Sequence, residues 1–215
     1  MKKEKPAILF DFDGVIANTE PLYDIFINQL GEKYNLGIDN FAGKVKGVPT
    51  VDIVKKYFSH LGESQAKKVA EEVQQFEIEM DIPPVAGALE FIDYLKQNGY
   101  KLALVTSSQL VKMKRALSIL NLENSFDTLV TADRITKGKP DPMCFLLAAN
   151  DLDMSPNNCI VFEDSIHGIN AGRNAGMKVI GLTSSFGEER IKDMVFEAIV
   201  DFTDQEKLKD IILNH

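Results

Sequence analysis

Two aspartates follow an apolar run near the start of the chain, with one residue between them. The run Ile8–Phe10 leads into Asp11, Phe12, Asp13 and Gly14. Alternate side chains of a strand lie on one face, so both carboxylates can reach one site at the end of such a strand. Two ionised carboxylates this close repel each other unless a cation or a shared proton lies between them. The pair therefore indicates Mg²⁺, which binds one or two carboxylates together with phosphate oxygens, although Asp and Gly are also common in simple turns.

Further polar side chains are expected at the same edge of the fold, because each follows a later predicted strand. They are a hydroxyl, an amine and two carboxylates, from Thr106, Lys139, Glu163 and Asp164. Ligands of open parallel sheets bind outside the carboxyl ends of the strands. Carboxylates there can hold a divalent cation, the lysine and the hydroxyl can hold phosphoryl oxygens, and one carboxylate is left to attack phosphorus.

Electrostatics decide whether such an attack is reasonable. A carboxylate and a phosphate dianion about 4 Å apart repel by about 4 kcal/mol per pair of charges at an effective dielectric near 20. A divalent cation together with Lys139 would more than offset this repulsion. Phosphoryl transfer is catalysed mainly by such positioning and charge neutralisation, so the set of residues predicts phosphoryl chemistry.

Strands alternate with helices over most of the chain. We predict strands at 7–10, 102–105, 128–131, 160–162, 179–182 and 198–200, and helices near 87–98, 110–120, 143–150, through 172, near 188–194 and from 204. The first strand is apolar throughout, as expected when both faces of a parallel strand are covered. The alternation predicts an α/β fold, a Rossmann-like parallel sheet with helices on both of its faces.

One interval between predicted strands is too long for an ordinary connection, which runs about 2–6 residues plus one helix. Residues 17–84 contain three helical stripes of apolar residues and no strand: Leu22, Phe26, Leu30 and Tyr34; Val51, Val54, Phe58 and Leu61; Val69, Val73, Phe76 and Met80. We therefore expect an α/β core from residues 1–16 and 85–215, with a helical domain, 17–84, inserted after the first strand.

Four motifs, in order, resemble those of the haloacid dehalogenase superfamily in its phosphotransferase branch. They are Asp11-Phe12-Asp13-Gly14-Val15, Thr106, Gly138-Lys139-Pro140 and Glu163-Asp164-Ser165-Ile166-His167-Gly168. The inserted helices resemble the small helical cap of that superfamily, and the branch most similar to this chain is that of β-phosphoglucomutase and related sugar-phosphate phosphatases. The resemblance spans essentially the whole chain.

The resemblance implies a role for each catalytic position. Asp11 would be the nucleophile that becomes phosphorylated, and Asp13 would protonate the leaving group and then activate water. Thr106 would bind phosphoryl oxygens with help from backbone amides near Phe12 and Ser107, and Lys139 would neutralise charge on the phosphoryl group and the nucleophile. Dehalogenases of the superfamily share the first aspartate but usually lack the second, so Asp13 favours phosphate chemistry.

The resemblance also implies a Mg²⁺ site. Its ligands would be the carboxylates of Asp11 and Asp164 and the backbone carbonyl of Asp13, with Glu163 bound directly or through water. The substrate would be a small phosphorylated metabolite, such as a sugar or polyol phosphate.

Substrate contacts are expected from Ser108 and from the cap loop that contains Lys46 and Gly47. This loop departs from the mutase pattern, because Thr50 stands where the branch carries an arginine, and Tyr23 stands where it carries a histidine. An arginine that grips a second phosphate suits a mutase, so its absence favours a phosphatase. A phosphomutase is the alternative, and a non-catalytic phosphate-binding regulator is a third hypothesis.

Composition limits the other classes of function. The 215 residues carry a net charge of -8 and no long basic run, which argues against a nucleic-acid ligand. No apolar stretch reaches the roughly 20 residues of a membrane span. Cys144 and Cys159 lack metal-ligand spacing and are expected to be buried thiols in a reducing cytosol. We therefore expect a cytoplasmic protein, with a monomer as the default.

Overall fold

The computed structural model describes residues 4–46, 48 and 50–214. Its contacts divide the chain into two compact units. The first, Met1–Asn18 with Ile82–His215, is called the α/β unit below, and the second, Thr19–Asp81, is called the helical unit. No helix of the described residues combines the length and the apolar character that crossing a membrane requires.

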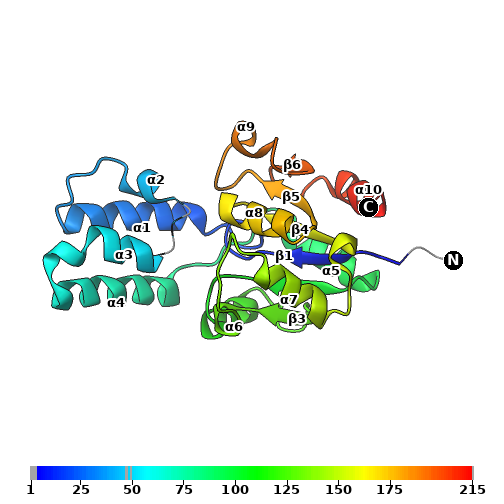
Figure 1. Cartoon of the computed structure of the whole chain (residues 1–215), viewed down its shortest axis with the longest axis horizontal. Helices are drawn as coiled ribbons and strands as arrows, with labels where there is room; N and C mark the ends of the chain where they lie inside the picture. Colours follow the sequence, from blue (N-terminus) through cyan, green and yellow to red (C-terminus); the bar gives the residue numbers. More distant parts are fainter. Residues whose placement is uncertain (1–3, 47, 49, 215) are drawn as a thin grey trace. The chain divides into compact units, whose positions relative to one another are not determined.

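Six parallel strands form the sheet of the α/β unit, in the order β3-β2-β1-β4-β5-β6 (Figure 1). Their bounds are Ala7–Phe10 (β1), Leu102–Val105 (β2), Thr128–Val130 (β3), Cys159–Glu163 (β4), Lys178–Leu182 (β5) and Glu197–Ile199 (β6). The predicted parallel, Rossmann-like sheet is confirmed. The carboxyl ends of β1, β2 and β4 lie side by side, because β1 pairs with both neighbours in register.

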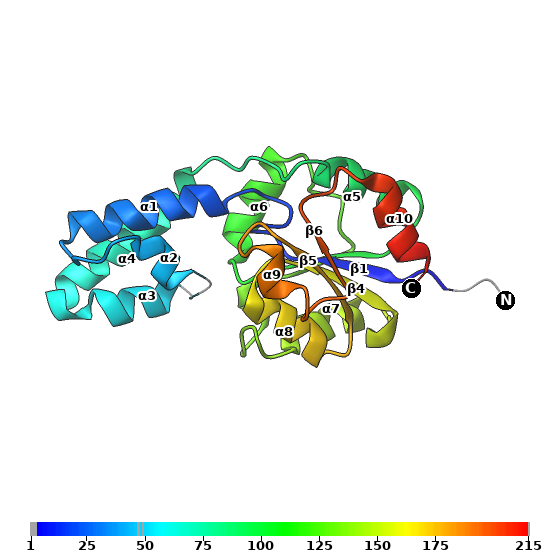
Figure 2. The ribbon, with the colours of Figure 1, turned by 90° about the horizontal axis from the view of Figure 1, so that it is seen from above.

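Helices cover both faces of this sheet (Figure 2). One face is covered by α5 (Ala88–Gln97), α6 (Leu110–Ile119) and α10 (Gln205–Leu213), and the other by α7 (Met143–Asp151), α8 (Ile166–Asn174) and α9 (Glu188–Ile191). The alternation of side chains along β1 explains the two layers. Ile8 and Phe10 enter the first core, whereas Ala7 and Leu9 enter the second.

Aromatic rings fill the first of these cores next to the carboxyl ends of β1 and β4. The ring of Phe10 stacks on that of Phe162 with centroids 5.0 Å apart, and both rings contact Phe202. All three side chains are completely buried. Burial of each is worth about 1.5–3 kcal/mol, so the ends of β1 and β4 are held firmly where their polar residues begin.

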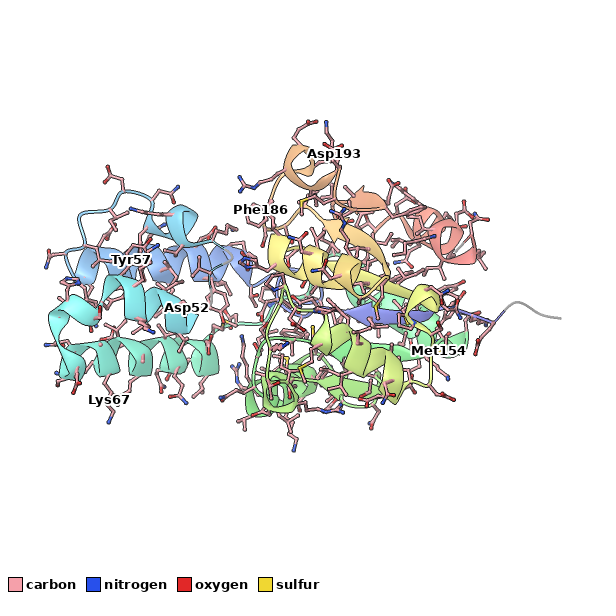
Figure 3. All side chains as sticks on the ribbon, in the orientation of Figure 1. Asp52, Tyr57, Lys67, Met154, Phe186 and Asp193 are labelled. Carbon is pink, nitrogen blue, oxygen red and sulfur yellow. The ribbon has the colours of Figure 1, made fainter. Side chains whose placement is uncertain are left out.

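The helical unit contains α1 (Glu20–Lys33), α2 (Phe41–Val45), α3 (Thr50–Tyr57), the 3₁₀ turn Ser59–Leu61 and α4 (Glu63–Glu79). Its own core is built around Phe41, Phe58 and Val69. The three predicted helices are present, and α2 is a further short one. The charged face of α4 is exposed, with Lys67 projecting outward beside Glu71 (Figure 3).

The two segments that lead out of and back into the α/β unit are paired with each other. The amide of Asn18 donates to the carbonyl of Pro83 at 2.7 Å, and the amide of Val85 donates to the carbonyl of Ile16 at 2.8 Å. Ala17 forms an antiparallel bridge with Pro84. The insertion therefore begins and ends at one place beside β1.

Candidate active site

Asp11 continues directly from β1. Its amide donates to the carbonyl of Phe162 on β4 at 3.0 Å, so the ladder extends to the first predicted catalytic residue. The chain then turns back, with the carbonyl of Phe12 accepting from the amides of Ile16 and Ala17. Gly14 adopts a φ of 73°, a left-handed conformation that glycine adopts without strain. This turn holds the Asp11 carboxylate at the end of the strand with 12% of the side chain exposed.

Lys139 connects the first motif with the last. Its ammonium group lies 2.9 Å from Oδ1 of Asp11 and 2.6 Å from Oε1 of Glu163. It also donates to the carbonyl of Val105 at the end of β2, at 3.4 Å. Only 8% of the lysine side chain is exposed. Three strands that are far apart in sequence therefore meet at one buried amine, as the motifs predict.

Glu163 is completely buried, and both of its carboxylate oxygens have partners. Oε1 receives Lys139, whereas Oε2 accepts from the amides of Asp164 and Ser165 at 2.9 and 2.8 Å and from the Ser165 hydroxyl at 3.0 Å. Gly168 is required beside this carboxylate, because a Cβ there would lie 1.6 Å from Oε1. These contacts make Glu163 a support for Lys139, and its predicted role as a metal ligand stays a prediction.

Asp11, Glu163 and Asp164 form a buried cluster of acids. One carboxylate oxygen from each lies within 4.8 Å of the others. Together with Lys139 they carry three negative charges and one positive charge when ionised, an imbalance that is costly at a buried site. An all-oxygen set with excess negative charge suits Mg²⁺, so the residues present fit a hard divalent cation. The Asp13 side chain is not part of this cluster.

The electrostatic cost of the cluster appears in the pKa values of Asp11 and Lys139. The pKa of Asp11 is raised from 3.8 to about 7, chiefly by burial; the charges of Glu163 and Asp13 also raise it, and Lys139 lowers it. For Lys139 burial favours the neutral amine, but the carboxylates of Asp11 and Glu163 dominate and raise its pKa above the usual range. Lys139 is therefore a permanent cation in this site.

Thr106 and Ser108 complete the phosphate side of the site after β2. Thr106 is buried, and its hydroxyl accepts from the amide of Ser108 at 3.0 Å. The hydroxyl of Ser108 lies 3.4 Å from Oδ2 of Asp13. The same oxygen lies 3.4 Å from the ammonium group of Lys112, in the first turn of α6. Asp13 has 24% of its side chain exposed, more than Asp11, which leaves it the more accessible carboxylate.

Some predicted contacts are not brought into this cluster. Ser107 is exposed, and the contribution predicted for it comes from its backbone amide. Lys46 lies in the helical unit, where its ammonium group forms ion pairs with Glu20 at 3.2 Å and Asp24 at 3.1 Å. Gly47 lies outside the described residues. The substrate-binding roles of these three residues stay predictions.

Sequence reasoning missed three residues that contact the site. They are Lys112, which pairs with Asp13, and Ser184 and Ser185, which bond to Asp164. The two serines directly follow the end of a predicted strand, so the rule that ligands bind at strand ends points to them. Nothing in the sequence points to Lys112, because its approach depends on how α6 packs.

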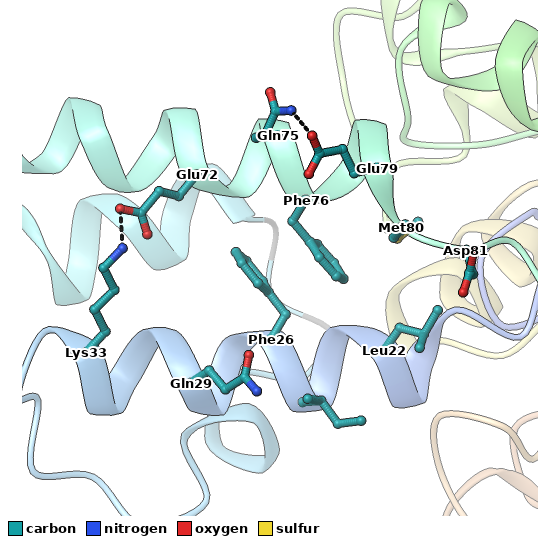
Figure 4. A pocket seen from close by; sticks show the side chains of 11 residues that line it. Leu22, Phe26, Gln29, Lys33, Glu72, Gln75, Phe76, Glu79, Met80 and Asp81 are labelled. Atoms are coloured by element: carbon teal, nitrogen blue, oxygen red, sulfur yellow. Dashed lines mark hydrogen bonds and ion pairs between the residues drawn. The ribbon is translucent and has the colours of Figure 1, made fainter.

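The helical unit contains a groove of its own (Figure 4). It lies between α1 and α4, where the rings of Phe26 and Phe76 stack with centroids 4.1 Å apart. Lys33 and Glu72 form an ion pair at its rim, 2.7 Å apart. Its lining is mainly apolar and contains no acidic cluster comparable to that around Lys139, so it does not account for the chemistry predicted from the motifs.

Comparisons with known proteins agree with the geometry. A family model described as haloacid dehalogenase-like hydrolase matches residues 8–182. The chain belongs to this family. It is 34% identical to the phosphorylated carbohydrates phosphatase of Thermotoga maritima over 191 residues, covering 85% of this chain and 87% of the relative. It is 30% identical to the validoxylamine A 7'-phosphate phosphatase of Streptomyces hygroscopicus, covering 86% and 89%.

A solved structure of β-phosphoglucomutase from Clostridium difficile superposes with a TM-score of 0.77 at 25% identity, over 98% of this chain and all of that one. The predicted superfamily is thus confirmed. Membership of this hydrolase family, with phosphatases among the similar relatives, also confirms the prediction of an enzyme that hydrolyses phosphoric monoesters.

Proposed function

We propose that the chain is a Mg²⁺-dependent phosphatase of a small phosphorylated metabolite and that it works through an aspartyl-phosphate on Asp11. The observation that carries the proposal is the position of Lys139, whose buried ammonium group bonds to both Asp11 and Glu163. A cation fixed against a carboxylate at the end of a strand is the arrangement that lets this carboxylate approach a phosphate.

In the first step, an oxygen of Asp11 attacks phosphorus and the bond between phosphorus and the alcohol oxygen breaks. Asp13 donates a proton to the departing alcohol, and its greater exposure allows it to exchange protons with water. In the second step, water attacks the phosphorus of the aspartyl-phosphate while Asp13 accepts its proton. Phosphate and the free Asp11 carboxylate result.

Asp11 and Asp164, with the backbone carbonyl of Asp13, are the residues that would hold Mg²⁺. The bound ion would neutralise charge on the phosphoryl group and on the attacking carboxylate. Thr106 would bind phosphoryl oxygens at the end of β2. Lys139 would bind them from its position beside the Asp11 carboxylate. Glu163 would hold Lys139 in place.

We further propose a sugar phosphate or polyol phosphate as substrate and the helical unit as a cap that selects it. Similar relatives are named as phosphatases of phosphorylated carbohydrates and of validoxylamine A 7'-phosphate. The insertion leaves and re-enters beside β1, close in sequence to Asp13. The monomeric state and the cytoplasmic location stay predictions.

The test is a phosphate-release screen over phosphorylated sugars, polyols and other metabolites, with MgCl₂ or with EDTA. We expect Mg²⁺-dependent release of free phosphate, lost in Asp11→Asn but kept in an exposed control variant, Asp193→Asn. Because a solved β-phosphoglucomutase is similar, the same reactions are analysed for isomerised sugar phosphate. Isomerisation without net phosphate release would refute the phosphatase proposal in favour of a phosphomutase.

The covalent intermediate is tested separately. Acid-quenched turnover followed by mass spectrometry should find one added phosphoryl group on the peptide that contains Asp11. A phosphatase that is fully active in Asp11→Asn, or that carries the phosphoryl group on another residue, would refute the assignment of the nucleophile.

A further inference from the structure

Ser184 and Ser185 follow β5 and reach two other loops of the site. The hydroxyl of Ser184 lies 2.6 Å from the carbonyl oxygen of Gly14 and 3.2 Å from Oδ2 of Asp164. The hydroxyl of Ser185 donates to the same Asp164 oxygen. Neither serine belongs to the four motifs, and neither contacts the attacking carboxylate in these bonds.

The two hydroxyls have different principal partners. A hydroxyl has one hydrogen to donate, and the shorter contact of Ser184 is the one to Gly14. We therefore assign Ser185 as the donor that fixes Asp164 and Ser184 as the donor that fixes the loop after β1. Both hydroxyls act at one place, because Gly14 packs directly against the Asp164 carboxylate: a Cβ on Gly14 would lie 2.0 Å from Oδ2 of Asp164.

The backbone that leads into the two serines is hydrogen-bonded to the sheet. The amide of Thr183, the residue before them, donates to the carbonyl of Ile199 on β6 at 3.0 Å. Asp164, at the other end of the bonds, is only 2% exposed. The carboxylate is thus enclosed on one side by hydroxyls and backbone, while one of its oxygens lies within 4.8 Å of oxygens from Asp11 and Glu163.

We propose that Ser184 and Ser185 are positioning residues for Asp164 and thereby set the affinity of the site for its divalent cation. The inference rests on the proposed function, because it takes Asp164 as a ligand. A carboxylate that must rotate into place loses conformational freedom when it binds a cation, and a carboxylate already held by hydrogen bonds does not. Loss of such outer partners typically weakens metal binding about 10–100-fold.

The experiment measures Mg²⁺ binding by isothermal titration calorimetry on the full chain after treatment with EDTA, without substrate. The variants are Ser184→Ala, Ser185→Ala, the double variant and Ser185→Thr, which keeps the hydroxyl. Ser118→Ala is the matched control, because Ser118 is exposed on α6. Thermal unfolding in EDTA checks that each variant is folded.

We expect the Kd for Mg²⁺ to rise about 10–100-fold in the double variant and less in each single alanine variant, and to stay near wild type in Ser185→Thr and Ser118→Ala. In phosphate release, the Mg²⁺ concentration for half-maximal activity should rise while kcat at saturating Mg²⁺ recovers. A merely structural role of the serines would lower the Tm in EDTA while leaving the Kd of the folded protein for Mg²⁺ unchanged.

Two other results would overturn the inference in different ways. If Asp164→Asn loses Mg²⁺ binding while all serine variants stay within about twofold of wild type, Asp164 is a ligand but the serines do not position it. If Asp164→Asn binds Mg²⁺ as wild type does, the metal site of the proposed function is wrong, and the inference fails with it.

Discussion

Replacing Asp11 by asparagine should make the metal-free protein more stable at alkaline pH while it abolishes turnover. Burial raises the pKa of Asp11 from 3.8 to about 7. The folded protein therefore binds this proton more tightly than the unfolded chain does, and the resulting stability is present below pH 4 and is lost as the pH rises through 7. Since each pKa unit is worth about 1.4 kcal/mol, holding Asp11 ionised costs about 4 kcal/mol.

Asparagine removes this charge but also loses the ion pair with Lys139 at 2.9 Å. Lys139 keeps its bond to Glu163 at 2.6 Å, so the amine is not left unpaired. We expect a net gain of about 2 kcal/mol at pH 8, which raises Tm by about 4–8 °C in a chain of this size. At pH 5 Asp11 is already protonated in the folded protein, and the advantage should vanish.

The assay is thermal unfolding by circular dichroism between pH 5 and 8 in EDTA, with Asp193→Asn as the control for loss of an exposed carboxylate. Asp193 projects from the surface of the α/β unit (Figure 3). Adding MgCl₂ should stabilise wild type more than Asp11→Asn. Equal or lower Tm values for Asp11→Asn at pH 8 in EDTA would refute the reasoning that the buried cluster strains the cation-free fold.

Three further substitutions separate the roles within the cluster. Lys139→Met should lower kcat/KM for phosphate release at least about 10³-fold. It should also destabilise the fold by about 3–5 kcal/mol, measured by urea unfolding in EDTA, because buried carboxylates lose their counter-charge. Near-normal activity would remove Lys139 from the mechanism. Glu163→Gln should weaken Mg²⁺ binding less than Asp164→Asn, since both Glu163 oxygens already have partners; an equal loss by calorimetry would make Glu163 a direct ligand. Gly168→Ala should lower stability by about 2–4 kcal/mol through its collision with Glu163, whereas Gly187→Ala, in open space, should not; similar Tm values for the two would contradict this packing.

Most of the fold could be predicted because its signals are local and repeated. The apolar run of β1 and the strand–helix alternation fix a parallel sheet, and the absence of any strand from the interval before residue 84 indicates an insertion. The short helix α2 was not separately predicted, since it has five residues, includes Gly43 and begins after Asn40 in a left-handed conformation. One member of the stripe predicted around α3 is wrong: Val51 is 75% exposed and Ile53, at 4% exposed, takes its place, whereas Phe58 is completely buried as expected.

The residues of the site could be predicted better than their contacts. Strand ends place Asp11, Lys139 and Glu163 at one edge, and the structure brings them together. The sequence does not reveal which donors hydrogen-bond to each carboxylate oxygen, because this depends on angles and on distances of a few tenths of an ångström. The engagement of both Glu163 oxygens and the approach of Lys112 to Asp13 therefore required coordinates.

The stability of this fold and its affinity for a cation depend on the same atoms. A buried set of three carboxylates with one lysine favours the folded state less than a neutral set would, and the raised pKa of Asp11 expresses this cost. A cation that binds only the folded chain repays it by mass action, by about 2.7 kcal/mol at a concentration 100 times Kd. Substitutions that relieve the strain must therefore also weaken the metal site. By this reasoning, the hydroxyls of Ser184 and Ser185 are informative because they fix Asp164 and the Gly14 loop beside it without adding or removing charge. They can change metal affinity while leaving the electrostatic cost of the cluster in place.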